Sequence, residues 1–443
     1  MKKLKTISRF SRTLSRLDPI VFSFAVLAVL LYILVNKGTP SLLATDSLAL
    51  PEGQYKAVLS VCSINSVWLG KYQVLARDKA LEADIVFDYE GYPLGFTEGD
   101  RVSGDCSLVA LSREVAYERS LLSKGVVARA HCSGFRLEKR PGGLAGIKWR
   151  LRASFRRLVE TSLSPPLSSL LLGMLSGDDS NMPGSFSEIM RNVGLSHIVV
   201  VSGYNVSIVY TALEKMLRFL GRRGAALVGL IGLSLFAWIV GPEPPVLRAV
   251  AMAAIAAIAT AAGRRVTGFR ALLLGSALML ISKPEWINSI SFHLSFLATL
   301  AIVYSGLLTP SGIDKLGMLG GFLKEFLIQT VVVLLFTLPY ILSVFGQFSW
   351  ISLVANLLVL PVCKAIMAFG ATAIVVSIFS KTLGRLFFSF PWVLLWYVLV
   401  VSDRLIELSS PIQVKLSTSV MLLVYAILAM CLFVLNVVRN AKE

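Results

Sequence analysis

The sequence predicts a polytopic α-helical membrane protein of about ten spans with a small all-β domain outside the cytoplasm. Of its 443 residues, 55% are hydrophobic and only 16% are charged, whereas a soluble domain carries about 25% charged residues. The mean hydropathy is +0.73, and apolar runs of spanning length recur from residue 195 onward. The net charge of +17 suits nucleic acid or anionic lipid, but basic residues also orient membrane spans.

The first element, residues 1–40, contains a cytoplasmic N-terminus and a membrane span. The basic, acid-free segment MKKLKTISRFSRTLSRL precedes an apolar run over residues 18–36. A cleaved signal peptide has a shorter apolar core and a small-residue cleavage site. We therefore predict an uncleaved span whose basic N-terminus stays in the cytoplasm.

Residues 41–141 form the predicted extracytoplasmic β domain. Short alternating runs such as YKAVLSVCSI and ADIVFDYEGYPL are separated by Gly, Asp and Pro. Alternation at this spacing predicts a small antiparallel barrel or sandwich. Oxidation is permitted outside the cytoplasm, so one disulfide is expected among Cys62, Cys106 and Cys132, with the pairing open.

Residues 142–193 are predicted to form amphipathic or interfacial helices. In LAGIKWRLRASFRRLV, an apolar helical stripe runs beside several basic residues. We favour a helix on the membrane surface over a phosphate-binding helix at a pore mouth. The phosphate-contact candidates in the second case are Arg150, Arg152, Arg156 and Arg157.

Two short helices are expected between residues 165 and 193, at the outer surface or dipping part-way into the bilayer. Their apolar cores are too short to span it. Between them, Asp178 and Asp179 follow Gly177. We interpret this acidic pair as a solvated turn, and not as a metal site.

Residues 194–443 form the predicted multi-span domain. Basic residues gather in alternate turns, so both chain termini are expected in the cytoplasm. The run at 271–283 is short and is open to a re-entrant path. The predicted spans lie near 195–213, 224–241, 245–263, 271–283, 286–306, 323–345, 350–378, 386–402 and 417–437.

Polar residues interrupt several of these spans. Such groups at membrane depth usually face the bundle interior or a water-filled path. The alternatives without a transport role are snorkelling of the Arg and Lys side chains, a hydrogen-bonded core histidine, and pairing with neighbouring helices. The candidate path residues are His197, Ser202, Gly203, Tyr204, Asn205, Arg248, His293, Ser295, Asn356 and Lys364.

Four motifs occur in one order: GLSHIVVVSGYNVSIV, PPVLRAVAMAA, SFHLSFLATLAIVY and NLLVLPV. Together they resemble the competence-domain signatures of the ComEC-type DNA-uptake channel family. The preceding β domain, with FTEGDRVSG, resembles that family's N-terminal OB-like domain. The resemblance covers residues 15–437 and implies a multi-pass channel in the inner membrane. Such a channel carries one strand of incoming DNA into the cytoplasm during natural transformation.

The resemblance also selects individual positions: His197, Ser202, Gly203, Arg248, Ser295 and Phe296. The signature usually reads Ser-Gly-Leu-His where this chain has Tyr204 and Asn205, and asparagine cannot titrate near neutral pH. We hypothesise that Gly203 permits close approach or a local break of the helix. Ser202 and Asn205 would then face water or a polyanion, and Arg248 would attract phosphates.

Catalysis is not expected of this chain. Its three histidines, His131, His197 and His293, have no metal-ligand spacing, and neither an HxHxDH element nor a Gly-rich phosphate loop occurs. We therefore predict no metal and no cofactor. The family's C-terminal metallo-β-lactamase-like domain is expected to be missing.

The expected partners are single-stranded DNA and the lipid bilayer. A separate DNA receptor, nuclease and cytoplasmic motor would supply binding, strand degradation and energy, and a homo-oligomer is compatible with the sequence. A second hypothesis is a secondary transporter or export component for an anionic or lipidic substrate. A third is a membrane scaffold whose β domain binds a partner.

Overall fold

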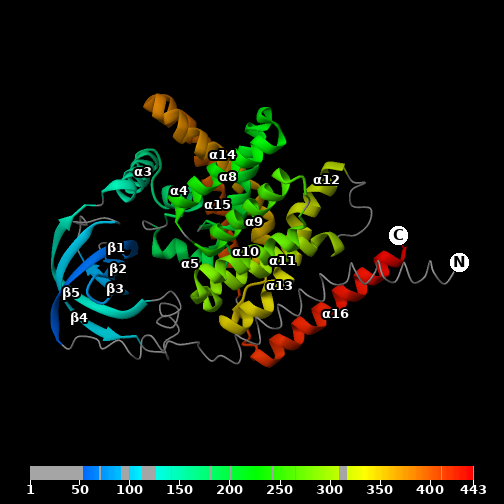
Figure 1. The fold of residues 1–443 in the computed structure, drawn as a ribbon, viewed down its shortest axis with the longest axis horizontal. Coiled ribbons are helices and arrows are strands. Elements are labelled where there is room, and N and C mark those ends of the chain that lie inside the picture. Colours follow the sequence, from blue (N-terminus) through cyan, green and yellow to red (C-terminus); the bar gives the residue numbers. More distant parts are fainter. Residues whose placement is uncertain are drawn as a thin grey trace.

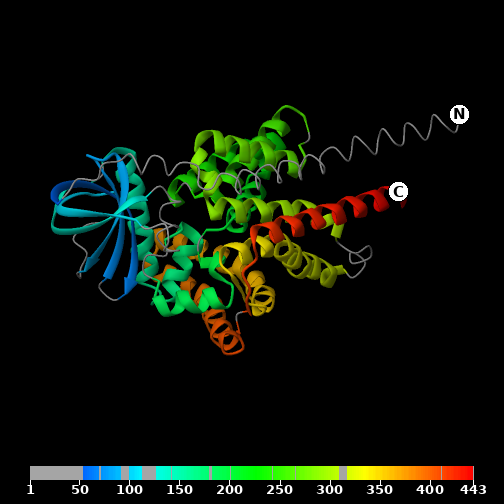
Figure 2. The same ribbon diagram turned by 90° about the horizontal axis from the view of Figure 1, so that it is seen from below.

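The computed structural model consists of a five-stranded barrel followed by a helical region, so the mostly helical class with a small β domain is confirmed. The barrel lies at one end of the molecule in both views (Figures 1 and 2). The predicted first span falls outside the described residues. The structure describes residues 53–68, 71–90, 99–111, 126–140, 142–178, 182–199, 201–241, 243–264, 266–308, 317–410 and 412–442.

The barrel closes in the strand order β1-β2-β3-β5-β4. β3 and β5 are parallel, and the other neighbours are antiparallel. This is the arrangement of a five-stranded Greek-key barrel such as the OB fold. The strands are β1 (Gln54–Trp68), β2 (Lys71–Asp78), β3 (Ala83–Glu90), β4 (Arg101–Ala110) and β5 (Val126–Lys139).

Alternation along the strands fills the barrel interior. Ala57, Leu59 and Val61 on β1 are almost fully buried, because side chains two residues apart share one face of a strand. The hydroxyl of Tyr55 donates to Oδ2 of the buried Asp78 at 2.5 Å. Burial first, and then this hydrogen bond, raise the pKa of the Tyr55 phenol above its ordinary value.

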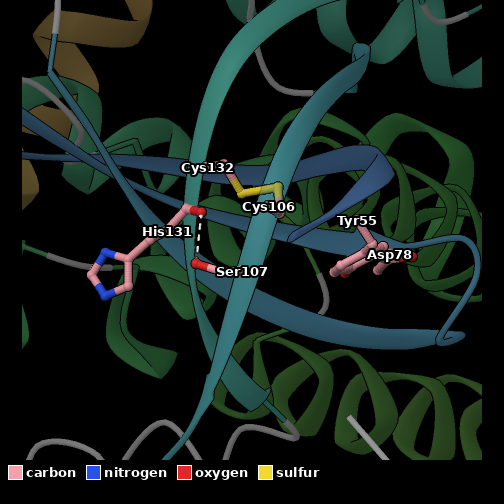
Figure 3. Close-up of a disulfide and its surroundings, with 6 residues drawn as sticks. All are labelled: Tyr55, Asp78, Cys106, Ser107, His131 and Cys132. Atoms are coloured by element: carbon pink, nitrogen blue, oxygen red, sulfur yellow. Dashed lines mark hydrogen bonds between the residues drawn. A yellow bond between two sulfur atoms is a disulfide. The ribbon is translucent and has the colours of Figure 1, made fainter. Parts of the chain in front are cut away.

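The structure joins Cys106 to Cys132 (Figure 3). These residues face each other directly on β4 and β5, which brings their Cβ atoms within bonding reach. Beside the disulfide, Oγ of Ser107 donates to the carbonyl oxygen of His131 at 3.5 Å, and the imidazole of His131 points away from the disulfide. Cys62 is exposed on β1.

The helical region begins at α3, next to the barrel, and ends at α16, which lies at its edge (Figures 1 and 2). A short pairing of β6 (Gln347–Phe348) with β7 (Ile412–Gln413) interrupts it. The helices are α3 (Gly143–Glu160), α4 (Leu167–Ser176), α5 (Gly184–Asn192), α6 (Ser196–Val199), α7 (Gly203–Met216), α8 (Gly221–Val240), α9 (Pro244–Ala261), α10 (Gly268–Ser282), α11 (Ile290–Leu308), α12 (Gly317–Phe322), the π-helix η5 (Leu323–Ile328), α13 (Gln329–Val344), α14 (Ile351–Phe379), α15 (Lys381–Glu407) and α16 (Thr418–Lys442), with 3-10 turns η2 (Arg218–Leu220) and η3 (Pro284–Asn288).

Five helices in the described part of the chain are long and apolar enough to cross a membrane. Side chains on their outward faces are apolar, for example Ile378 at 69% exposure and Phe379 at 85%, as expected of a surface that contacts lipid. Shorter apolar helices, including α10 and α11, accompany them. The five segments are Arg223–Val240, Pro244–Ala261, Phe326–Val344, Ile351–Phe379 and Lys381–Glu407.

α4 is enclosed by other helices, so the surface position, one of the two sequence expectations for this helix, is wrong. All of its residues except Leu175 are buried, and it packs against α3, α6, α8, α14 and α15. A ten-residue helix is only about 15 Å long, so α4 can be enclosed by longer helices. It ends at Gly177, which has a left-handed φ of 70°, a usual helix terminator.

Candidate functional site

The predicted span 195–213 is wrong as a continuous helix. α6 ends at Val199, the chain is extended at Ser202 (φ −97°, ψ 164°), and α7 begins at Gly203. Oγ of Ser202 accepts a hydrogen bond from the backbone N–H of Asn205 at 3.3 Å, so Ser202 is the N-cap of α7. The polar break in this apolar run therefore starts a new helix.

Three consecutive residues of α7 face three different neighbours. Successive α-helical residues are about 100° apart around the axis, so the first turn points in three directions. Gly203 lies against α9, Tyr204 faces α14, and Asn205 contacts α4. The start of α7 is thus enclosed by three helices from distant parts of the sequence.

Gly203 permits a close approach of Arg248 on α9. A Cβ atom added to Gly203 would meet Nη2 of Arg248 more closely than real atoms allow, and would lie 3.7 Å from Cζ. The guanidinium therefore lies directly against the N-terminal turn of α7. Both parts of the hypothesis about Gly203 agree with this geometry, since the residue borders a break and accommodates a close neighbour.

Arg248 is buried, with 7% of its surface exposed, so the snorkelling alternative does not describe it. Among the described residues, Nε and Nη1 have no hydrogen-bond partner. A buried, unpaired guanidinium is costly, because the charge has lost its hydration without a compensating anion. This residue is therefore the strongest single indication of a ligand in the helical region.

Lys364 on α14 lies between two aromatic rings. Its Nζ is 5.8 Å from the ring centroid of Tyr204 and 5.5 Å from that of Phe326, within cation–π range. Phe326 belongs to the π-helix η5, a type of distortion that is frequent at functional sites. On α14, which carries Lys364, Oδ1 of Asn356 is buried and has no hydrogen-bond partner in the described part of the chain.

Asn205 has the contacts of a packing residue. It is 2% exposed; its Nδ2 donates to the carbonyl oxygen of Met174 on α4, and its Oδ1 accepts from Oγ of Ser202, both at 3.3 Å. These bonds correspond to pairing with a neighbouring helix, and not to a side chain that faces a path. Ser202 is half-buried, and His197 on α6 is exposed.

His293 belongs to a second polar cluster on α11 and α13. Its Nδ1 is 2.7 Å from the hydroxyl oxygen of Tyr340, as the core-histidine alternative predicts. Nearby, the hydroxyl of Tyr425 on α16 donates to the carbonyl oxygen of Phe336. Ser295 follows on α11 and is half-buried. The hydrogen bonds of this cluster join α11, α13 and α16, whereas the hydrogen bond of Asn205 to Met174 joins α7 to α4.

Among the four candidate arginines of α3, Arg156 forms an ion pair with a buried carboxylate. Nε and Nη2 of Arg156 donate to Oδ2 of Asp178 at 2.8 and 2.5 Å, and Asp178 is buried. The solvated-turn interpretation of Asp178 is therefore wrong, and the guanidinium of Arg156 is already engaged. Arg150 and Arg157 are exposed, and Arg152 is half-buried.

We predict that replacing Arg156 by methionine lowers the free energy of unfolding by roughly 2 kcal/mol, because Asp178 loses two charge-assisted hydrogen bonds. This is less than for a fully buried pair, since a third of the Arg156 side chain is exposed. Thermal unfolding of the detergent-purified protein measures the change. Arg157→Met, an exposed neighbour, is the matched control, and equal midpoints for the two variants would contradict the prediction.

Sequence reasoning missed several residues that the structure places at or near the site. Phe326 and Met174 carry no local signal, because one contributes a ring and the other a backbone carbonyl. Asp178 was considered only as part of a solvated acidic pair, although the basic helix that precedes it in the sequence is a signal for an ion pair. Among the residues described, no group of three or more His, Cys, Asp or Glu side chains could hold a metal ion.

The fold and site define a helical membrane protein with an N-terminal barrel and a buried cation beside an interrupted helix. The family model described as "Competence protein" matches residues 174–439, and the chain belongs to this competence family. It is 28% identical over 261 residues to ComE operon protein 3 of Bacillus subtilis (strain 168), which is 58% of this chain and 32% of that protein.

Two further relatives are uncharacterised. YcaI of Escherichia coli (strain K12) is 27% identical over 221 residues, covering 48% of this chain and 29% of its own length. A protein of Aquifex aeolicus (strain VF5) is 34% identical over 140 residues, covering 31% of this chain and 33% of its own length. The matched region thus spans about a third of each curated relative. No solved structure matches the chain.

Proposed function

We propose that this chain is a membrane channel component that carries single-stranded DNA into the cytoplasm during natural transformation. The observation that carries the proposal is the guanidinium of Arg248, buried against the start of α7 in a competence-family chain, with two nitrogens that have no hydrogen-bond partner among the described residues. A passing polyanion compensates such a charge without any permanent counter-ion, since phosphates are the common feature of every DNA sequence.

The proposed setting is the inner membrane, with both termini in the cytoplasm and the barrel on the outer side. Basic turns support this orientation, for example the stretch from Lys215 to Arg223 and the group near Arg264. The chain's role is transport and not hydrolysis. A separate receptor, nuclease and motor would deliver the strand, degrade its complement and supply energy.

A second candidate is a secondary transporter or export component for an anionic or lipidic substrate. The discontinuity between α6 and α7 favours it, because transporters often place half-helix N-termini against anionic substrate groups near the bilayer midplane. The two candidates share the anion site but differ in the size of the substrate.

Deletion of the gene in its own host tests the proposal, under conditions in which the parent strain takes up labelled DNA. We expect DNA to remain bound outside but to lose its entry into the cytoplasm, and transformants to disappear. Restoring the gene on a plasmid should restore the entry of DNA and the transformants. Unchanged entry of labelled DNA in the deletion strain would exclude the channel role and leave the transporter candidate.

A further inference from the structure

The N-terminus of α7 has the properties of an anion site. The helix has 14 residues and no acidic residue in its first turn. Ser202 caps only the N–H of Asn205, and the N–H of Val206 bonds to the carbonyl oxygen of Ser202. The N–H groups in the first turn of a helix have no preceding carbonyls within the helix, so they point outward from its N-terminus. Aligned peptide dipoles add partial positive charge at this end.

A second, independent feature points to the same place. Arg248 is more than nine-tenths buried, its guanidinium touches the position of Gly203, and two of its nitrogens lack partners among the described residues. Arg248 lies on α9, whose first turn contains no acidic residue and whose N-cap residue, Glu243, is exposed. A planar guanidinium beside the N-terminal turn of a helix is a donor arrangement that suits a phosphate oxyanion.

We propose that the first turn of α7 and the Arg248 guanidinium bind one phosphate group, with Gly203 leaving the space in which the two donor sets meet. The assignment of that phosphate to a phosphodiester of the DNA strand rests on the proposed function; the site itself does not. The donors contact no base, so binding is independent of DNA sequence. The site acts as a stepping point at which successive phosphates of the strand are held.

Binding is measured by equilibrium dialysis of radiolabelled inorganic phosphate against the full chain, purified in a zwitterionic detergent at constant ionic strength. We expect saturable binding of one phosphate per chain. Arg248→Gln should weaken it at least tenfold. Gly203→Ala should weaken it less, because the added methyl displaces the far end of the arginine side chain. Arg264→Gln, an exposed arginine beyond the end of the same helix, should bind as the parent does.

Two competitors then identify the source of the phosphate. Displacement by oligothymidine, but not by phosphatidylglycerol micelles, supports the strand as the occupant. Displacement by phosphatidylglycerol alone retains the site and overturns the strand assignment. Absence of saturable phosphate binding, or equal binding by Arg248→Gln, overturns the site.

The two proposals fail separately. Normal DNA entry in the deletion strain, together with Arg248-dependent phosphate binding, removes the channel role and leaves the site. Loss of DNA entry in the deletion strain, together with no phosphate binding to the purified chain, keeps the channel role and removes the site.

Discussion

Arg248→Gln is expected to reduce the entry of labelled DNA roughly ten- to a hundredfold, since hydrogen bonds to a charged group are worth about 1.5–3 kcal/mol each. The protein itself should accumulate in the membrane as well as the parent or better. A buried, unpaired charge opposes folding, so a neutral side chain of similar length removes that cost. Lower DNA entry with an equal or higher protein level would indicate that Arg248 is retained for binding. If Arg248 had a purely structural role, its replacement would lower both DNA entry and the protein level.

Internalised, nuclease-resistant DNA per cell measures the effect, normalised to the amount of protein in the membrane fraction. Arg264→Gln is the control, because it removes the same charge from an exposed position. Arg248→Lys should give an intermediate value, since lysine keeps the charge but not the planar fork of donors. Parental entry in Arg248→Gln cells would contradict a role for this guanidinium.

Gly173→Ala is expected to cause the largest loss of folded protein, roughly 3 kcal/mol or more. A Cβ atom on Gly173 would overlap the carbonyl oxygen of Val199. That oxygen belongs to the backbone at the end of α6, so it cannot move aside as a flexible side chain would. Either α4 or α6 must shift, and both lie in the core built around α4, α14 and α15.

Gly229→Ala on α8 is the matched control for this variant. A Cβ atom there would lie 3.6 Å from a ring carbon of Tyr210, an ordinary contact, and alanine favours helix over glycine. The unfolding midpoint in detergent and the level of protein in the membrane both report the difference. If the two alanine variants unfolded at the same temperature, the close contact between α4 and α6 would not matter for stability.

The interruption between α6 and α7 is held in place by contacts on either side of it. Gly173 allows α4 to approach Val199 before the break, and Met174 on the same helix accepts the amide of Asn205 after it. α4 therefore contacts the chain on both sides of the break. This explains why a short helix that cannot span a bilayer lies at the centre of the fold.

Much of the architecture was predictable from residue order. Period-two alternation in β1 follows from strand geometry, and long apolar runs such as those of α14 and α15 form helices because lipid leaves backbone groups no other partner. The Ser-Gly pair at residues 202 and 203 also indicated a break, because serine caps helices and glycine tolerates close neighbours. These are local properties, which a chain carries wherever its segments are finally placed.

Contacts between distant segments were not predictable in this way. The pairing of Cys106 with Cys132, the ion pair of Arg156 with Asp178, and the approach of Arg248 to Gly203 all join residues from separate elements. Each depends on strand register or helix packing, which no short stretch of sequence encodes. Sequence alone therefore indicated which residues were polar within an apolar run. Packing determined that Asn205 bonds to α4, while two guanidinium nitrogens of Arg248 have no hydrogen-bond partner among the described residues.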